Sequence, residues 1–520
     1  MADATDTRRL APEVRAVAIV VIVGAIMSIL DTTIINVGLD TLSRDLHAPL
    51  SQIQWVSTAY LLALATVIPL TGWAAERFGA KRTWMASVAA FIAASVLCGL
   101  AWSADSLIAF RVLQGLAGGM IMPIGIITLA QAAGPRNMGR VMSVVGVPML
   151  LAPVFGPLLG GVIVEHLSWS WLFYVNVPFG LLGLVLAQRR MADDRATGHH
   201  EHAGRLDVPG LLLLSPGVAL VVYGLSEIAA TGQILVWRAL GTLAAGMLLT
   251  TLFALRSWRH DFPVVDVRLL RGSGFAAATI TMALAGAALF GGMILLPLYY
   301  QVDRGLSAID VGLLLAPQGI GAAAAMRWSG ALTDRYGGGP VVTAGLLVLL
   351  VGTVPFALVT GSTPYWWLAL ALLVRGVGLG FTLMPTMASA YALLDHHEVP
   401  RATPMLNVLQ RIGGAIGVAV LAVILQREID AAFGGAGGEA AAQAMSAAQR
   451  AVMSDRVADA FGTAYWWSMA MVAAALIPAL VMWRQQRRTR GAAEFGPTLP
   501  ADAEIDTVDV DAPDAEPVSG

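Results

Sequence analysis

The chain has little charge, one cysteine and one lysine in 520 residues. Charged residues make up 13% of it, about half of the roughly 25% typical of soluble domains. The single cysteine, Cys98, lies within an apolar stretch, so the sequence offers neither a disulfide nor a thiolate metal site. A formal net charge of -2 argues against nucleic-acid binding. We therefore predict no metal, no cofactor and no nucleic-acid partner.

Motifs of several enzyme classes are absent as well. The chain has no nucleotide-binding loop of the G-x-x-x-x-G-K-[S/T] type, no G-x-S-x-G elbow and no H-E-x-x-H pair. A membrane-embedded enzyme or a receptor is therefore a weak alternative. The absence of the nucleotide-binding loop also argues against direct use of ATP and leaves an ion gradient as the energy source.

Long apolar runs dominate what is present. Apolar residues make up 57% of the chain, and runs of about 20 residues, the length of a membrane span, recur throughout it. Because backbone polar groups in lipid must be satisfied internally, and because the runs do not alternate as barrel strands do, we predict an all-α membrane protein. Fourteen spans are predicted, near residues 16–37, 54–75, 83–101, 105–130, 141–164, 169–187, 207–226, 236–255, 274–299, 308–332, 340–359, 365–393, 404–426 and 463–483.

The distribution of basic residues predicts the orientation. With the N-terminus inside, 22 of the 32 basic residues fall in cytoplasmic segments, six on the opposite side and four within spans. Such an excess is the pattern of cytoplasmic loops. We expect a multi-pass protein of the cytoplasmic membrane with both termini in the cytoplasm.

Two segments are predicted to lie outside the membrane. Residues 427–462 form an external loop, either a plain linker or a loop with an Ala-rich surface helix. Residues 485–520 form a tail that ends in an acidic stretch without basic residues, typical of a disordered, solvated end.

A short motif occurs twice, each time after an apolar run on the same predicted side of the membrane. Residues 72–82 read GWAAERFGAKR and residues 330–339 read GALTDRYGGG, so both contain G-x-x-x-[D/E]-R-x-G. A repeat of this kind indicates two related halves, as in several secondary transporters. We interpret the motif as a conformational latch, although an ordinary positive-inside loop is an alternative. Its residues are Gly72, Glu76, Arg77, Gly79 and Lys81 in the first copy and Gly330, Asp334 and Arg335 in the second.

Three further stretches, together with the repeated motif, resemble the major facilitator superfamily, specifically its fourteen-helix drug:proton antiporter branch (QacA/EmrB-like). LDTTIINVGLD at residues 30–40 keeps the pattern of the branch's first helix, and LIAFRVLQGLAGG at 107–119 keeps L-x-x-x-R-x-x-Q-G. APVFGPLLGG at 152–161 carries the antiporter motif at Gly156, Pro157, Gly160 and Gly161. Close helix packing alone is the alternative role of these glycines, since G-x-x-x-G permits it.

The resemblance implies an organisation and an activity. It implies a cytoplasmic segment 1–14, a six-helix bundle 15–190, a linker with two extra helices 191–273, and a second six-helix bundle 274–484. The implied activity is proton-coupled efflux of small organic, amphipathic or cationic compounds, as in multidrug and antibiotic resistance. A proton-coupled importer on the same fold is the alternative. The implied partners are the substrate, protons and the lipid bilayer, and the expected state is a monomer from a bacterial source.

Asp31 and Arg111 are the predicted proton-coupling residues. At 1.5 Å per residue, Asp31 lies about 22 Å from the cytoplasmic end of its helix, and Arg111 lies about 9 Å from the opposite face. In a hydrocarbon core of about 30 Å these depths nearly coincide. Charged residues inside a membrane are functional by default because they are costly there. The alternative is that Asp31 caps a helix end or pairs with Arg111 only to hold helices together.

Other polar side chains within the spans are candidates for substrate lining. These are Asn36, Trp55, Tyr60, Gln114, Tyr299 and Gln318. Each is also compatible with ordinary packing or with an interfacial aromatic belt. For Arg375 two alternatives stay open, a counterpart of Arg111 or an arginine that pairs with helix carbonyls, and we assign it no role.

Overall fold

A computed structural model of the chain describes residues 11–134, 137–192, 205–233, 235–304, 306, 308–395, 398–433 and 447–494. All regular elements in these ranges are helices, as expected for apolar segments whose backbone must satisfy itself in lipid. Eleven of the helices are long and apolar enough to cross a membrane, or up to twelve if one bent pair counts as a single span. The chain is therefore a multi-pass helical membrane protein, and this count is lower than the predicted fourteen.

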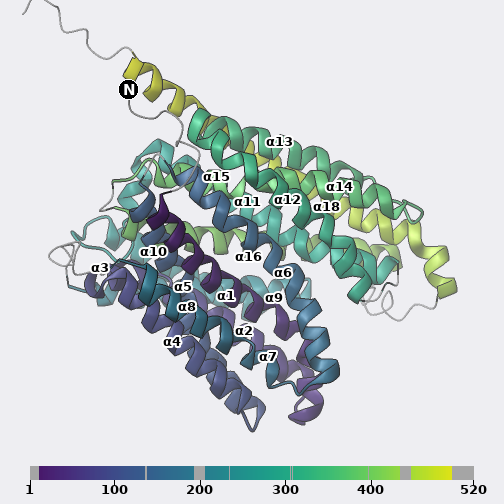
Figure 1. The fold of residues 1–520 in the computed structure, drawn as a ribbon. Coiled ribbons are helices and arrows are strands. Elements are labelled where there is room, and N and C mark those ends of the chain that lie inside the picture. Colours follow the sequence, from purple (N-terminus) through teal and green to yellow (C-terminus); the bar gives the residue numbers. More distant parts are fainter. Residues whose placement is uncertain are drawn as a thin grey trace, which may run out of the picture.

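The helices before residue 191 gather in one bundle, which we call the first bundle (Figure 1). They are α1 (Pro12–Asp45), α2 (Leu50–Val67), α3 (Leu70–Phe78), α4 (Ala80–Gly99), α5 (Ala104–Ala133), α6 (Met138–His166), α7 (Trp171–Tyr174) and α8 (Asn176–Arg190). The helices α2 and α3 are the bent pair, with an angle of 57° between them. Pro69 lies at the bend, where its ring removes a backbone donor.

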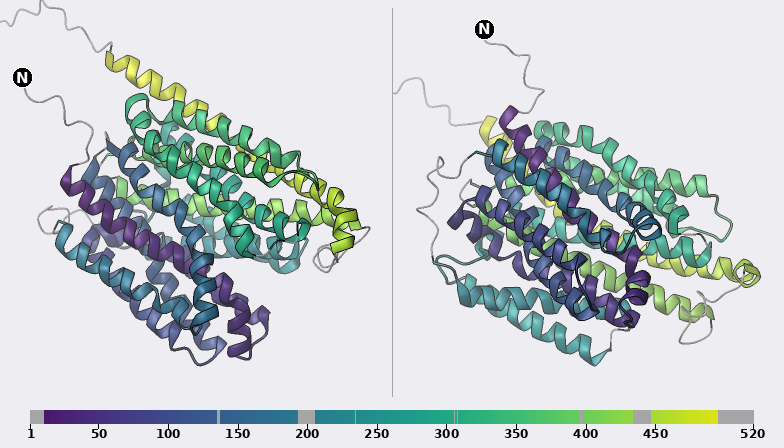
Figure 2. Two further views of the ribbon diagram at one scale, coloured as in Figure 1. Left: turned by 45° about the vertical axis from the view of Figure 1, so that its right-hand side comes forward. Right: turned by 60° about the horizontal axis from the view of Figure 1, so that its bottom comes forward.

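The helices after residue 272 form the second bundle. They are α11 (Ser273–Leu298), the π-helical turn η5 (Tyr299–Asp303), α12 (Ala308–Tyr336), α13 (Gly338–Ala357), α14 (Tyr365–Gly380), α15 (Leu383–Tyr391), α16 (Val399–Phe433) and α18 (Ala447–Glu494). Between the bundles come α9 (Val208–Thr231), α10 (Trp237–Ser257) and the short turn η4 (Val267–Arg271). The helix α9 packs on α10, α16 and α2, so the inserted pair lies along one edge of the molecule (Figure 2).

The repeated motif has the same backbone role in both bundles. Its last glycine is Gly79 in the first copy and Gly337 in the second, with φ angles of 89° and 87°. Residues with a Cβ rarely adopt such angles, whereas glycine does so at little cost. Each glycine separates two helices, α3 from α4 and α12 from α13. The motif is thus a tight helix-to-helix turn that occurs once per bundle.

Two predicted non-helical segments differ from the structure. In the predicted loop 427–462, α16 continues to Phe433 and α18 begins at Ala447, so only 434–446 lies outside the described residues. In the predicted tail 485–520, α18 continues to Glu494, and the rest lies outside the described residues. Alanine, glutamine, methionine and arginine are strong helix formers, and these residues continue the adjoining helices.

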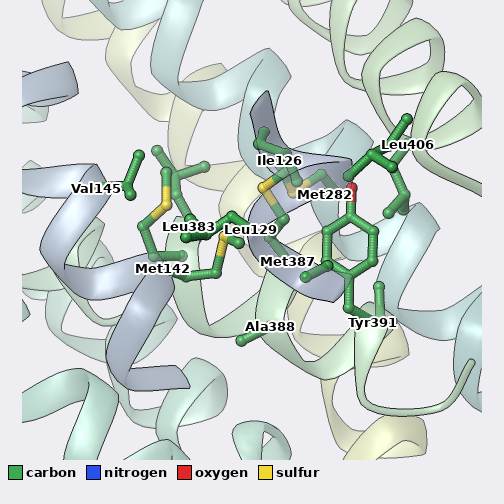
Figure 3. Packing of buried hydrophobic residues seen from close by; sticks show 14 of the residues in the cluster. Ile126, Leu129, Met142, Val145, Met282, Leu383, Met387, Ala388, Tyr391 and Leu406 are labelled. Atoms are coloured by element: carbon green, nitrogen blue, oxygen red, sulfur yellow. The ribbon is translucent and has the colours of Figure 1, made fainter. Parts of the chain in front are cut away.

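Both bundles meet at the end of the molecule that carries the start of α1 and the last turns of α18, which we call the terminal end (Figures 1 and 2). A buried apolar cluster joins the bundles there, and we call it the apolar seal (Figure 3). Its members include Ile126, Leu129, Met142 and Val145 from the first bundle and Met282, Leu383, Met387, Tyr391 and Leu406 from the second. Toward the opposite end the ribbons of the two bundles diverge (Figure 1).

Candidate functional site

A buried ion pair lies inside the first bundle. Asp31 on α1 and Arg111 on α5 are 0% and 1% exposed, and Arg111 Nη1 donates to Asp31 Oδ2 at 2.7 Å. The residues are 80 positions apart in the sequence and come together because α1 and α5 pack against each other. Charges in so buried a place persist only if they are paired and hydrogen-bonded.

Three further side chains complete the coordination of this pair. Gln114 Nε2 and Asn176 Nδ2 both donate to Asp31 Oδ1, at 2.8 and 2.7 Å. The side-chain oxygen of Gln114 accepts from Arg111 Nη1 at 2.7 Å, and its amide also donates to the Ser95 hydroxyl at 2.7 Å. These residues come from α4, α5 and α8. The carboxylate thus accepts three hydrogen bonds from three different side chains.

The guanidinium of Arg111 is held on its other sides as well. Its Nε donates to the backbone carbonyl of Val56 at 3.0 Å. The ring of Tyr60 lies 4.0 Å from the guanidinium carbon, and the ring of Phe173 lies 5.7 Å from it. A cation over an aromatic face gains further stabilisation when it is desolvated. The cation therefore has fixed partners on α1, α2, α5 and α7.

This arrangement makes the charge state of Asp31 decisive for the surrounding helices. All three groups that face the carboxylate are donors, so the ionised form fits them. Protonation would place an O–H among donors and would remove the negative charge beside Arg111. A buried pair that loses one charge leaves the other uncompensated, at a cost of about 3–5 kcal/mol. A proton on Asp31 would therefore disfavour this packing of α1, α5 and α8.

The predicted antiporter motif on α6 packs directly against α1 near Asp31. A Cβ at Gly156 would clash with the Thr33 hydroxyl, and one at Gly160 would lie 2.9 Å from the backbone oxygen of Ile34. Gly161 faces open space, with nothing within 4 Å of a Cβ. The side chain of Pro157 lies outside the described residues. Two of the motif's glycines are thus required for the contact between α1 and α6.

At the terminal end, the acidic residue of the second motif copy crosses to the first bundle. Asp334 accepts hydrogen bonds from the backbone N–H groups of Gly139 and Arg140, at 3.0 and 3.2 Å. These groups belong to the first turn of α6, where unsatisfied donors and the helix dipole favour a negative charge. A Cβ at Gly330 would lie 2.7 Å from the backbone oxygen of Gly139, so glycine permits this approach.

The acidic residue of the first copy makes the reciprocal contact. Glu76 pairs with Arg401 in the first turn of α16, with 3.4 Å between Oε1 and Nε. Gly72 faces the backbone oxygen of Pro400 so closely that a Cβ would clash. The basic residues of the two copies have different surroundings. Lys81 donates to the backbone oxygen of Met191 at 2.9 Å, within the first bundle, whereas Arg77 and Arg335 are exposed.

The predicted substrate-lining residues do not form one group in the structure. Tyr60 and Gln114 are fully buried and belong to the surroundings of the ion pair. Asn36 is exposed, and Trp55 is 42% exposed and stacks on Tyr223 of α9, with 5.9 Å between ring centroids. The other two are in the second bundle: Tyr299 is buried in an aromatic cluster, and the side-chain oxygen of Gln318 is buried without a hydrogen-bond partner among the described residues.

Several residues of these contacts were not singled out by sequence reasoning. Asn176 lies in the stretch WSWLFYVNVPFG, residues 169–180. A polar amide within an apolar span is the one sequence feature that could have marked it as a site residue. Ser95 and Arg401 carried no comparable signal. Within the described ranges, no three His, Cys, Asp or Glu side chains gather as metal ligands would.

Comparisons with known proteins agree with this architecture. A family model described as Major Facilitator Superfamily matches residues 21–418. A "Multidrug resistance protein B homolog" of Mycobacterium tuberculosis is 37% identical over 493 residues, which cover 91% of each chain. A "Tetracenomycin C resistance and export protein" of Streptomyces glaucescens is 32% identical over 430 residues, 79% of this chain and 76% of that protein.

Among solved structures, a proton:xylose symporter of the major facilitator superfamily shares the fold, with a TM-score of 0.59. Its sequence is 15% identical, and the alignment covers 91% of this chain and 95% of the symporter. The matched family model and the fold indicate a transporter rather than an enzyme. This multi-pass membrane chain belongs to the Major Facilitator Superfamily.

Proposed function

We propose that the chain exports small organic compounds across the cytoplasmic membrane in exchange for protons, by alternating access. The observation that carries the proposal is the buried Asp31–Arg111 pair. Thr33, two residues after Asp31 on α1, packs against Gly156 of the antiporter motif. The names of the resistance and export relatives support export as the direction of transport.

We also propose the fourteen-span organisation of the antiporter branch, with the domain boundaries expected from the sequence. The twelve spans that pass on length and apolarity do not include α6 and α12. Each of these helices has 29 residues, enough to span about 30 Å of hydrocarbon at 1.5 Å per residue. They contact each other closely between the two bundles. With both added, the terminal end is the cytoplasmic one, and both termini are cytoplasmic.

In the proposed cycle, the structure represents the conformation that is closed on the cytoplasmic side. The apolar seal and the two acidic contacts of Asp334 and Glu76 support closure there. A proton reaches Asp31 from the opposite side and weakens the network around it. The bundles then rock, the cytoplasmic contacts open, and Asp31 releases the proton inward. Cargo moves outward in the complementary half-cycle.

The substrate class that we propose is amphipathic organic compounds. The charge of Asp31 is neutralised by Arg111. A cationic group on the cargo would therefore find no free negative charge at Asp31. Arg411 on α16 is partly buried and interacts electrostatically with Tyr60 of the other bundle. A permanently cationic cargo would therefore meet positive charge between the bundles, whereas an uncharged amphipathic compound would not.

The test uses the full chain in proteoliposomes with an imposed pH gradient. A set of fluorescent amphipathic dyes, matched in size and differing in charge, serves as cargo. We expect dye movement against proton flow, release of lumenal protons only when dye is present, and loss of both in Asp31→Asn. Dye movement in the same direction as protons would favour an importer. Unchanged coupled transport in Asp31→Asn would overturn the proposal.

A further inference from the structure

The second bundle contains a buried arginine, Arg375, that has no charged partner among the described residues. Its side chain on α14 is 3% exposed. Its Nε and Nη1 donate no hydrogen bond within the described part of the chain. The nearest aromatic ring over which it lies is that of Tyr465 on α18, 5.9 Å from the guanidinium carbon. An uncompensated charge in such a place is strongly unfavourable, so a compensating group is expected.

Arg375 has the same place in the second bundle that Arg111 has in the first. Arg111 faces Asp31 on the first helix of its bundle, and Arg375 faces Gly292 on α11, the first helix of the second. A Cβ at Gly292 would clash with Arg375 Nη2. The second bundle has thus kept the arginine, but a glycine stands where the first bundle has its carboxylate.

Buried hydroxyl groups lie beside the same arginine or beside its neighbour Tyr465. The Tyr465 hydroxyl interacts with the Arg375 guanidinium. The hydroxyls of Ser468 and Tyr300 are buried, and neither has a hydrogen-bond partner in the described ranges. Ser468 follows Tyr465 by three residues on α18 and so lies on the same helix face. Tyr300 and Arg375 both interact electrostatically with Tyr465. Hydroxyls and a guanidinium can all donate to one acceptor, and no acid is among them.

We propose that Arg375 forms an anion site in the second bundle, which takes a small group with a single negative charge. The source is either a free halide such as chloride or the carboxylate of a transported compound. One arginine matches one negative charge, and the hydroxyls supply further donors. The surrounding cluster is apolar and includes Phe356, Leu368 and Leu372, which favours a small anion over a large hydrated one. The proposal does not depend on proton exchange.

The first experiment measures thermal unfolding of the purified full chain in nanodiscs at fixed pH and ionic strength. Chloride is titrated against gluconate in one series, and acetate against gluconate in another. We expect a saturable rise of Tm, because a ligand that binds only the folded state stabilises it. A rise with chloride identifies a free halide, and a rise with acetate alone identifies a carboxylate.

The variant Arg375→Gln should lose the anion-dependent rise in Tm. The matched control is Arg327→Gln, which removes an exposed arginine from α12 of the same bundle and should keep the rise. If wild type shows no saturable response to either anion, or if Arg375→Gln responds like wild type, the proposal is overturned. Water molecules would then satisfy the guanidinium.

A second variant, Gly292→Asp, supplies the carboxylate within the chain. The clash is with the far end of the flexible Arg375 side chain, which can move. We expect this variant to bind no radiochloride in an equilibrium binding assay and to have a Tm that no longer depends on the anion. Full anion binding by Gly292→Asp would show that the site is elsewhere and would overturn the proposal. If this variant does not fold, the comparison of Arg375→Gln with Arg327→Gln decides.

Discussion

The Thr33 hydroxyl on α1 occupies the space that a Cβ on Gly156 of α6 would need. Thr33 Oγ1 is held there, because it donates to the backbone oxygen of Ile29 at 3.1 Å. Asp31 lies two residues earlier on the same helix. A side chain at position 156 would therefore push α1 and move the carboxylate relative to Arg111. The antiporter motif therefore acts on the ion pair through the position of α1.

We expect Gly156→Ala to uncouple transport while Gly161→Ala does not. A methyl group at position 156 overpacks the contact with Thr33, and overpacking costs about 1–3 kcal/mol. Position 161 has open space for the same methyl group. The measurement is proton flux into proteoliposomes with and without cargo, read by a lumenal pH dye. Gly156→Ala should leak protons without cargo, and equal behaviour of the two variants would contradict the role of the contact.

The Asp31–Arg111 pair should show strong energetic coupling. Asp31→Asn and Arg111→Gln each leave a buried group without its partner, and we expect each to lower the free energy of unfolding by about 3–5 kcal/mol. The double variant leaves no unpaired charge, so its loss should be clearly smaller than the sum of the two. Reversible unfolding in mixed micelles measures all four proteins. Additive losses would mean that the two charges do not stabilise each other.

The sequence alone was sufficient to predict the helical membrane fold and the occurrence of one copy of the repeated motif in each half. The apolar runs predict helices, and the motif repeats in the same context, because both features are local in the sequence. Depth along a helix also predicted that Asp31 and Arg111 lie at similar levels. Depth does not give rotation about the helix axis, however. Packing of the surrounding helices determines that rotation, so the direct 2.7 Å contact is visible only in the structure.

The remaining partners depend on contacts between distant segments. Asn176 on α8 donates to the Asp31 carboxylate, and the Ser95 hydroxyl on α4 accepts from Gln114 and Asn176. Nothing in either local sequence gives this register. Arg401 pairs with Glu76 because α16 of one bundle meets α3 of the other. The sequence left open whether residues 427–462 form a plain linker or contain a surface helix. The structure continues α16 to Phe433 and begins α18 at Ala447, in keeping with the helix preference of alanine.

Asp334→Asn should favour opening of the terminal end. The carboxylate faces the first turn of α6, where a negative charge contributes up to about 2 kcal/mol in a partly buried position. The amide keeps the shape and loses the charge. Distances between spin labels placed at the terminal end on α6 and α12 measure the opening. We expect a larger fraction of Asp334→Asn molecules than of wild-type molecules to have the long distance. Asp395→Asn, at an exposed position near the same end, should leave the distribution unchanged, and a similar change in both variants would contradict the latch.

Asp303, in the turn η5 after α11, is a candidate for pH dependence outside the spans. Burial raises the pKa of its carboxyl to about 6. The Ser454 hydroxyl and the Arg304 guanidinium stabilise the ionised carboxylate and so act in the opposite direction. The Ser454 hydroxyl donates to Oδ1 at 2.9 Å, and Arg304 Nε lies 3.2 Å from Oδ2. Tyr299, which accepts from Arg304 Nε at 3.0 Å, and Asp455 are the other titratable groups that face it.

A pKa raised above the unfolded value means that the folded state binds the proton more tightly. Stability contributed by this group is therefore greatest at low pH and is lost as pH rises from about 4 through about 6. We expect Asp303→Asn, which mimics the protonated form, to raise Tm at pH 7.5 and to leave it nearly unchanged at pH 4.5. The exposed Asp40, with a side-chain exposure of 79%, supplies the control Asp40→Asn, whose effect on Tm should be small at both pH values. A Tm that falls in Asp303→Asn at pH 7.5 would show instead that the ionised pair with Arg304 stabilises the fold.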